Sequence, residues 1–411
     1  MNTAISLILI LGIIVYTILK KRDFLSPATT FSIVMLFAFF LHSLQLSKMQ
    51  TDYGVESLLV VLSALASFWI GSKLSKVVKS KRKKPKYGLN KRRFKTMFYL
   101  LFLAVVGSYF VTWVILGAPP LLSKVDRATY FVSGIGTIYL LIDSLSFMAI
   151  YDWFGDKILG KKSLLVLLVI VLMMITVSNK FQIFALLCQG LILYNVEKKK
   201  VKLKYIALLL LLVLLIFVAF YSYIYDGMYI SSDALYLETG MKLPSNLSFL
   251  TEPYLYVAYN FDNLFNYMFN VSNVVFGHGY FVIHGLVESA NITNFMVPDH
   301  QTLDILWSNN LEHWWLTTGT CFKEFYQDFG MFGILFGTGI IGLICGKAYN
   351  SVKEHANIFN TYLYTICMVS ILFAFFTNNF IAVKTLVNIA CMYFVYLVCR
   401  ERKDENDSKD S

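Results

Sequence analysis

Residues 73–117 read KLSKVVKSKRKKPKYGLNKRRFKTMFYLLFLAVVGSYFVTWVILG, a basic block followed by a long apolar run. The first 23 residues of this stretch hold twelve lysines and arginines and no acid, whereas the last 22 hold no charge. A helix needs about 20 mainly apolar residues to cross the hydrocarbon core of a bilayer. We therefore predict that the chain crosses a membrane here, with the basic block on the cytoplasmic side.

The composition of the whole chain supports a membrane protein. Of 411 residues, 57% are hydrophobic and 15% are charged, whereas an ordinary soluble domain carries about 25% charged residues. The 35 phenylalanines and 26 tyrosines exclude a disordered chain, and the seven prolines exclude fibrous classes. The expected fold class is an all-α polytopic integral membrane protein.

Eleven apolar runs are candidate membrane spans. Two of them, 163–178 and 181–194, are short and joined only by Asn179 and Lys180, so they form either two spans or one re-entrant hairpin. The candidate spans are 3–19, 28–47, 55–75, 96–117, 133–154, 163–178, 181–194, 205–222, 331–348, 358–377 and 380–398.

Basic residues predict the orientation, because lysine and arginine near span ends are retained in the cytoplasm. With the N-terminus outside and the C-terminus cytoplasmic, 29 of the 36 basic residues fall on the cytoplasmic face. The predicted parts are a transmembrane bundle of about eight spans (1–222, with the basic loop 73–95), a large external loop (223–328), C-terminal transmembrane helices (329–398) and a charged cytoplasmic tail (399–411). We interpret the basic loop as retention beside anionic lipid, not as a nucleic-acid site.

The large external loop has the opposite charge to the rest of the chain. It contains eleven acidic residues against two basic ones, four of the six histidines, and aromatic stretches such as NNLEHWW at 309–315. Loops of this length inside compact domains are uncommon and usually functional. Aromatic faces beside amides and carboxylates suit carbohydrate, so we favour a polar-substrate site; the alternative is an interfacial aromatic belt.

Three external cations are candidate anion ligands. Arg127 lies in the outer segment APPLLSKVDRATYF, where no retention signal explains it, and a guanidinium is well shaped for phosphate. Pairing with Asp126 or anchoring at the interface are the alternatives. Lys180 lies at the tip of 163–194 and Lys323 lies eight residues before the ninth span, each with a structural role as the alternative.

Two further polar residues lie inside predicted spans. Asp143 is midway along the fifth span, and we prefer a protonated, hydrogen-bonded structural role for it over proton coupling, because no other span holds an interior acid. His42 is interpreted as a packed or interfacial histidine. Cys321 is the one cysteine of the external loop, and no cysteine spacing predicts a disulfide framework or a metal site.

The segment TTGTCFKEFYQDFGMFGILFGTGIIGL (317–343) resembles the end of the external loop in the oligosaccharide repeat-unit polymerases, the Wzy-type O-antigen and capsule polymerases. The resemblance is carried by Thr320, Phe325-Tyr326, Asp328-Phe329-Gly330 and Gly333, with FGHGYF at 276–281 upstream. It covers about thirty residues by motif and most of the chain by architecture. Members often carry arginine where this chain has Lys180, and lysine lacks the bidentate fork.

The resemblance implies a GT-C-like glycosyltransferase at the outer face of the bacterial inner membrane. It would move a growing glycan from its polyprenyl-pyrophosphate carrier to a sugar hydroxyl of an incoming lipid-linked repeat unit. Its partners would be that lipid-linked oligosaccharide, the bilayer, a chain-length regulator and a flippase, with no nucleic acid, cofactor or metal. No D-x-D nucleotide-sugar site is present.

The implied reaction assigns roles to the candidates. Developing charge on the pyrophosphate needs fixed cations, for which Arg127, Lys180 and Lys323 are available, and the attacking hydroxyl needs a general base. The candidate catalytic residues are His313, Glu324 and Asp328, and the candidate glycan-binding residues are His278, Tyr326 and Trp314.

Glu324 and Asp328 would share one helix face, and their repulsion would raise the pKa of one of them. The alternative for Asp328 is helix capping. The small-residue spacing of Gly333, Gly337, Gly342 and Gly346 predicts close helix packing.

Other functions stay open at the level of sequence. Within the same chemistry, the chain could be an O-antigen ligase. From a different class, it could be a flippase or transporter of lipid-linked glycans, although no internal repeat is seen and the loop mass lies on one side. A structural membrane protein without activity is the fourth reading.

Overall fold

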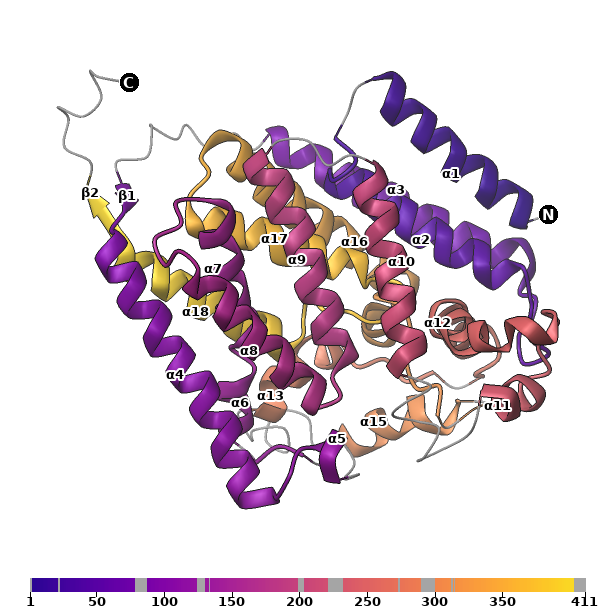
Figure 1. Ribbon diagram of the computed structural model, residues 1–411. Helices are drawn as coiled ribbons and strands as arrows, with labels where there is room; N and C mark the ends of the chain where they lie inside the picture. Colours follow the sequence, from indigo (N-terminus) through magenta and orange to yellow (C-terminus); the bar gives the residue numbers. More distant parts are fainter. Residues whose placement is uncertain are drawn as a thin grey trace. The chain divides into compact units, whose positions relative to one another are not determined.

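A computed structural model of the protein is shown in Figure 1. It describes residues 2–20, 23–77, 87–123, 130–132, 134–198, 203–220, 232–272, 274–289, 300–311, 313 and 315–402. Helices make up most of these residues, and one two-stranded antiparallel sheet joins β1 (Tyr87–Leu89) to β2 (Arg400–Arg402). The predicted all-α membrane class is confirmed at this level.

The chain divides into two compact units, each built from segments that are distant in sequence. Unit 1 comprises Met1–Lys79, Ile230–Asn350 and Ser370–Val383, and unit 2 comprises Ser80–Tyr229, Ser351–Val369 and Lys384–Ser411. Each unit therefore takes residues from more than one of the predicted parts, and the predicted boundaries at 222 and 328 stay a prediction about membrane topology.

Unit 1 is organised around α2, which packs against α1, α3 and α12. Aromatic rings fill the contact between α2 and α12, with Phe39 meeting Phe261 and Phe265 edge to face. The elements of unit 1 are α1 (Asn2–Leu19), α2 (Pro27–Ser43), α3 (Gly54–Val77), α11 (Ser232–Glu238), the 3-10 helix η3 (Ser245–Leu250), α12 (Thr251–Phe269), α13 (Tyr280–Ser289), α15 (His300–Asn309) and most of α16 (Lys323–Glu354).

Glycines bring α3 and α16 into backbone contact. The sequence predicts close helix packing at four α16 glycines, and two of them contact α3. A Cβ at Gly342 would collide with the carbonyl of Phe68, and one at Gly346 would meet Ser72 and Ser75. Ser67 Oγ also donates a hydrogen bond to the carbonyl of Leu335. Gly333 and Gly337 instead make room for Phe325 of their own helix.

A kink divides α16 into a short first segment and a long apolar one. Phe329 (φ −143°) and Gly330 (φ 60°, ψ −144°) leave helical geometry. Gly330 is in the left-handed region, which glycine adopts without a Cβ penalty. The kink therefore separates Lys323–Asp328, which carries the polar candidates, from the apolar run that follows.

Unit 2 is a helical bundle in which α7 contacts α4, α8 and α9, and α9 contacts α10. Asn90 caps α4 by accepting a hydrogen bond from Arg93 N at 2.9 Å, and its own N–H donates to the carbonyl of Cys399 at the end of α18. The remaining elements are α4 (Lys91–Leu116), α5 (Pro120–Ser123), α6 (Ile135–Tyr139), α7 (Ile142–Phe154), α8 (Lys162–Thr176), α9 (Lys180–Lys198), α10 (Leu203–Phe220), α17 (Ile358–Leu372) and α18 (Val383–Cys399), the last two mostly in this unit.

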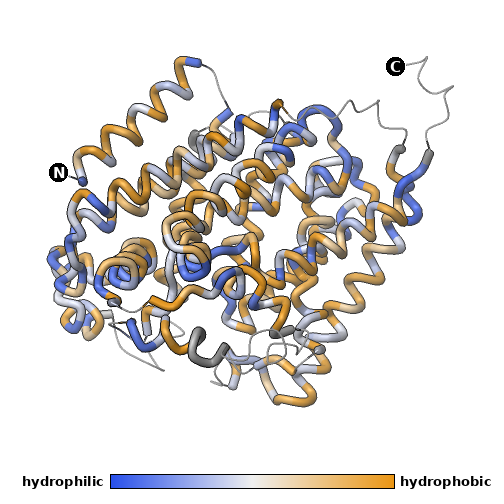
Figure 2. The backbone as a smooth tube through the Cα atoms, turned by 180° about the vertical axis from the view of Figure 1, so that it is seen from behind, coloured by the Kyte–Doolittle hydropathy of each residue, from blue (hydrophilic) through white to orange (hydrophobic). Residues whose placement is uncertain are grey.

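In the part of the chain that the structure describes, five stretches are long and apolar enough to cross a membrane: Asn2–Leu19, Gly54–Val77, Lys91–Ser123, Ile135–Phe154 and Lys323–Glu354. The described residues also form five shorter apolar helices, at Pro27–Ser43, Lys162–Thr176, Leu208–Ala219, Ile358–Leu372 and Val383–Cys399. Figure 2 shows that hydrophobic residues are spread over most of the helices. The count of eleven crossings stays a prediction. The segment 163–194 forms two separate helices, α8 and α9, of which α8 has 15 residues.

Candidate functional site

A pocket of about 530 Å³ lies within unit 1, among the helices that follow α12 and the turn between α17 and α18. A volume of roughly 300–1,000 Å³ is typical of small-molecule sites. The pocket collects side chains from α13, α15, the first turns of α16 and the segment 377–382. Its lining residues are Phe281, His284, Gly285, Trp307, Ser308, Lys323, Glu324, Gln327, Thr377, Asn378, Ile381 and Ala382.

The start of α16 is held in place by buried backbone contacts. Cys321 N donates to the carbonyl of Ala374 at 2.7 Å, and Phe322 N donates to Thr320 Oγ1 at 3.2 Å. Thr320, Cys321 and Phe322 are all fully buried. Burial raises the pKa of the Cys321 thiol well above its ordinary value, so it stays a protonated packing group. These contacts fix where the first turn of α16 places Lys323 and Glu324.

Lys323 and Trp307 form the polar and aromatic wall of the pocket. The Lys323 amine lies 4.3 Å from the centroid of the Trp307 ring, a cation–π arrangement. The indole is itself oriented, because Trp307 Nε1 donates to the carbonyl of Thr317 at 2.9 Å. One face of a fixed aromatic ring and one positive charge therefore lie together at the pocket.

Glu324, Gln327 and Asn378 bring buried polar atoms to the same pocket. Glu324 Oε2 and both polar side-chain atoms of Gln327 and of Asn378 make no hydrogen bond. Asn378 lies beside Glu324, and Gln327 lies beside the buried hydroxyl of Tyr267, but neither pair reaches hydrogen-bond geometry. Buried polar atoms are almost always paired in proteins, so these five atoms call for an explanation.

Asp328 has a structural task. Its Oδ1 accepts from Phe281 N at 3.0 Å and its Oδ2 accepts from Val282 N at 2.9 Å, so its carboxylate caps the start of α13. Backbone hydrogen bonds from Gly277 N to Gln327 O and from His278 N to Asp328 O complete the junction. Helix capping, the alternative role that the sequence offered for Asp328, is therefore favoured. The capped helix is α13, whereas the sequence suggested the membrane span that follows Asp328.

Three other predicted residues lie elsewhere in unit 1. His313 contacts the rings of Tyr259 and Trp315 and does not line the pocket. Tyr326 donates to the carbonyl of Met268 at 3.4 Å and packs near Tyr267. His278 is exposed, with a left-handed backbone and its ring near Phe329.

The remaining predicted residues are not placed together with these. Arg127 and Trp314 lie outside the described residues. Lys180 belongs to unit 2, where it is 2% exposed and its amine lies 4.2 Å from the Phe217 ring centroid. A common anion site for Arg127, Lys180 and Lys323 therefore stays a prediction.

Two side-chain pairs give structural roles to residues that stood out in the sequence. His42 Nδ1 lies 3.0 Å from Asp262 Oδ2, and both side chains are buried between α2 and α12. In unit 2, Lys384 Nζ lies 2.7 Å from Asp143 Oδ2, which provides Asp143 with the charge partner that the sequence left unidentified. Buried charges require such partners.

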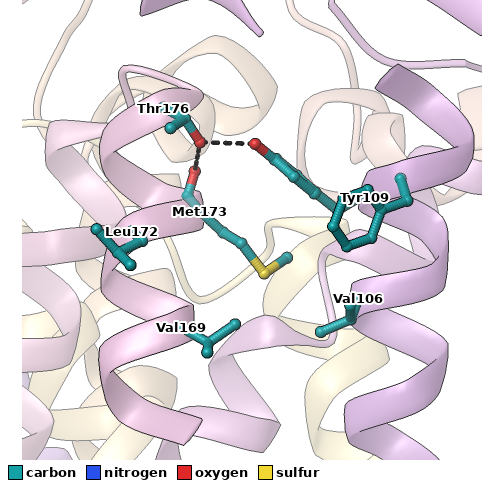
Figure 3. A pocket seen from close by; sticks show the side chains of 7 residues that line it. Val106, Tyr109, Val169, Leu172, Met173 and Thr176 are labelled. Atoms are coloured by element: carbon teal, nitrogen blue, oxygen red, sulfur yellow. Dashed lines mark hydrogen bonds between the residues drawn. The ribbon is translucent and has the colours of Figure 1, made fainter. Parts of the chain in front are cut away.

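A smaller, apolar pocket of about 160 Å³ lies in unit 2 between α4 and α8 (Figure 3). Its polar atoms are already satisfied, because the Tyr109 hydroxyl and Thr176 Oγ1 are 2.9 Å apart and Thr176 also donates to the carbonyl of Met173. This pocket offers hydrocarbon surface only, so the unit 1 pocket is the better candidate for polar chemistry.

The sequence identified Lys323 and Glu324 as candidate site residues, but among the other lining residues it did not identify Gln327, Asn378, His284 and Trp307. Gln327 lies inside the motif segment FYQDFG. Asn378 lies in the segment TNNF between two predicted spans, and the only sequence signal for it was a pair of polar residues between two apolar runs. His284 and Trp307 carried no local signal that separated them from other loop aromatics and histidines. Comparison with protein-family models, curated proteins and solved structures gives no match.

Proposed function

We propose that the protein is a glycosyltransferase that polymerises polyprenyl-pyrophosphate-linked oligosaccharide repeat units at the outer face of the bacterial inner membrane, producing O-antigen or capsular polysaccharide. The proposal rests on the resemblance of residues 317–343 and on one structural observation. The observation is the unit 1 pocket, in which Lys323 and Glu324 share a wall with Trp307 and two buried carboxamides.

In the proposed reaction, Glu324 in its carboxylate form accepts the proton of the acceptor hydroxyl. The hydroxyl oxygen forms a bond to the anomeric carbon of the donor glycan, and the bond from that carbon to the phosphate oxygen breaks. The lipid pyrophosphate leaves with the electron pair. Fixed cations stabilise the charge that develops on it, and we assign this role to Lys323, with Arg127 and Lys180 as the further candidates from sequence.

Glu324 is preferred over the other candidate bases because of its surroundings. Both carboxylate oxygens of Asp328 accept backbone N–H groups, whereas Glu324 Oε2 is buried without a hydrogen bond. His313 contacts aromatic rings away from the pocket lining. A base must lie within hydrogen-bond reach of the proton that it removes, and Glu324 lines a cavity that can hold a sugar.

The test uses cells that lack the gene and carry variants on a plasmid. We expect Glu324→Gln to abolish polymer and to leave single repeat units on the surface, while Lys323→Ala and Arg127→Ala reduce polymer strongly at normal membrane levels of protein. Removal of one charge-stabilising group typically costs about 10²–10³ in rate. Polymer is measured by gel electrophoresis of surface glycan.

Matched controls are Glu238→Gln and Lys242→Ala, which alter exposed residues outside the pocket and should leave the polymer unchanged. Wild-type polymer in Glu324→Gln cells would overturn the role of Glu324. Repeat units trapped inside cells that lack the gene, with a bare surface, would instead identify a flippase.

A further inference from the structure

The carboxamides of Gln327 and Asn378 are the least explained groups of the pocket. Gln327 is 0% exposed and Asn378 is 3% exposed, and neither the oxygen nor the nitrogen of either side chain makes a hydrogen bond. A buried amide that lacks partners destabilises the folded state. Its presence twice in one pocket, beside Glu324, points to a ligand that supplies the missing partners.

The donor and acceptor pattern restricts the class of that ligand. A carboxamide offers two N–H donors and a carbonyl acceptor. A phosphate group only accepts hydrogen bonds, so it would leave both carbonyl oxygens of the carboxamides unpaired. A cation would satisfy only oxygens. A ligand with both an N–H and a C=O group satisfies both halves of a carboxamide.

The apolar part of the lining restricts the ligand further. Phe281, Ile381 and Ala382 face the same cavity as the two amides. A sugar hydroxyl would form hydrogen bonds with the two carboxamides but would leave the apolar side chains without a contact. An acylamino group carries an N–H, a C=O and a methyl group, and so it matches the amides and the apolar residues together.

We propose that the unit 1 pocket binds an N-acylamino sugar as the acceptor, with Gln327 and Asn378 hydrogen-bonded to the acylamino group and the reacting hydroxyl facing Glu324. The role of this sugar as the acceptor rests on the proposed polymerase function. Its binding does not, because binding can be measured without turnover. Gln327 and Asn378 are then specificity-determining residues.

The experiment compares two pairs of methyl glycosides with the purified full-length protein in detergent: N-acetylglucosamine against glucose, and N-acetylgalactosamine against galactose. Binding is measured by saturation-transfer NMR with competition titration. In at least one pair we expect the acetamido glycoside to bind about tenfold more tightly, since tenfold corresponds to about 1.4 kcal/mol, the scale of a single net hydrogen bond.

The variants Gln327→Met and Asn378→Leu should reduce this preference to about onefold to threefold. Their apparent melting temperatures should not fall, because the replaced atoms make no hydrogen bond in the folded protein. The control Asn270→Ala removes an exposed carboxamide at the end of α12 and should keep the full preference.

The outcomes separate this inference from the proposed function. Equal binding of both members of each pair, or a preference that survives both pocket variants, overturns the assignment of the sugar class even if Glu324 proves essential for polymer. A preference that is lost in the pocket variants, together with normal polymer in Glu324→Gln cells, supports the sugar site and overturns the proposed transferase.

Discussion

Asp262 lies at the centre of a buried hydrogen-bond network that joins α2, the segment after it and α12. Its Oδ2 lies 3.0 Å from His42 Nδ1, and its Oδ1 accepts from Thr51 N at 3.0 Å. Gln50 Nε2 donates to the same carboxylate at 3.4 Å. The sequence indicated a packed or interfacial role for His42, but Asp262 was one of eleven acids in the predicted external loop, and only the fold identifies it as the partner of His42.

Replacement of this carboxylate should destabilise unit 1. We expect Asp262→Ala to lower the free energy of unfolding by about 1–3 kcal/mol, because it leaves the buried His42 ring without its hydrogen-bond partner and removes the acceptor of the Thr51 N–H. The apparent melting temperature in detergent can be followed with a thiol-reactive dye, since five of the six cysteines are buried. The control is Asp233→Ala, at an exposed residue of α11 that accepts one hydrogen bond from Ser248 Oγ, and it should lower the melting temperature much less. An equal shift in both variants would contradict the prediction.

At the scale of elements, the packing of α3 on α16 places the pocket. The long second segment of α16 is anchored by its glycines against α3, and the kink at Phe329–Gly330 then directs the first segment, with Glu324 and Gln327, toward the pocket. The sequence predicted glycine packing but not the kink, because FG in an apolar run is compatible with a straight helix.

A side chain at Gly342 should therefore disturb this pair of helices. Gly342→Leu is expected to destabilise the protein by about 1–3 kcal/mol or more, since its Cβ would collide with the backbone of Phe68. Gly12→Leu is a matched control in α1, where nothing lies within 4 Å of an added Cβ. Thermal unfolding in detergent gives the comparison, and an unchanged melting temperature for Gly342→Leu would refute the close α3–α16 contact.

At the scale of the whole molecule, the distribution of charge predicts how the chain lies in the membrane. The formal net charge of +11 combines a strongly basic predicted cytoplasmic face with an external loop that has nine more acidic than basic residues. The structure shows helices suited to the membrane, whereas the sidedness stays a prediction from the charges.

Reporter fusions test the predicted orientation. Green fluorescent protein fused after Ser411 should fluoresce, and alkaline phosphatase inserted at Gly240, between α11 and η3, should be active, because the first folds in the cytoplasm and the second only outside it. The reciprocal fusions should be inactive and serve as controls. The reverse pattern would show that the basic segments lie outside.

The sequence by itself determined the class of this protein, because a membrane helix depends on about 20 consecutive apolar residues and sidedness depends on the charges next to them. Both properties are local. It also pointed to Lys323 and Glu324, which sit in one motif. Only the tertiary structure brought His284, Trp307, Gln327 and Asn378 to the same pocket. Proximity between residues almost a hundred positions apart is decided by which helices pack together, and that is a property of the whole fold.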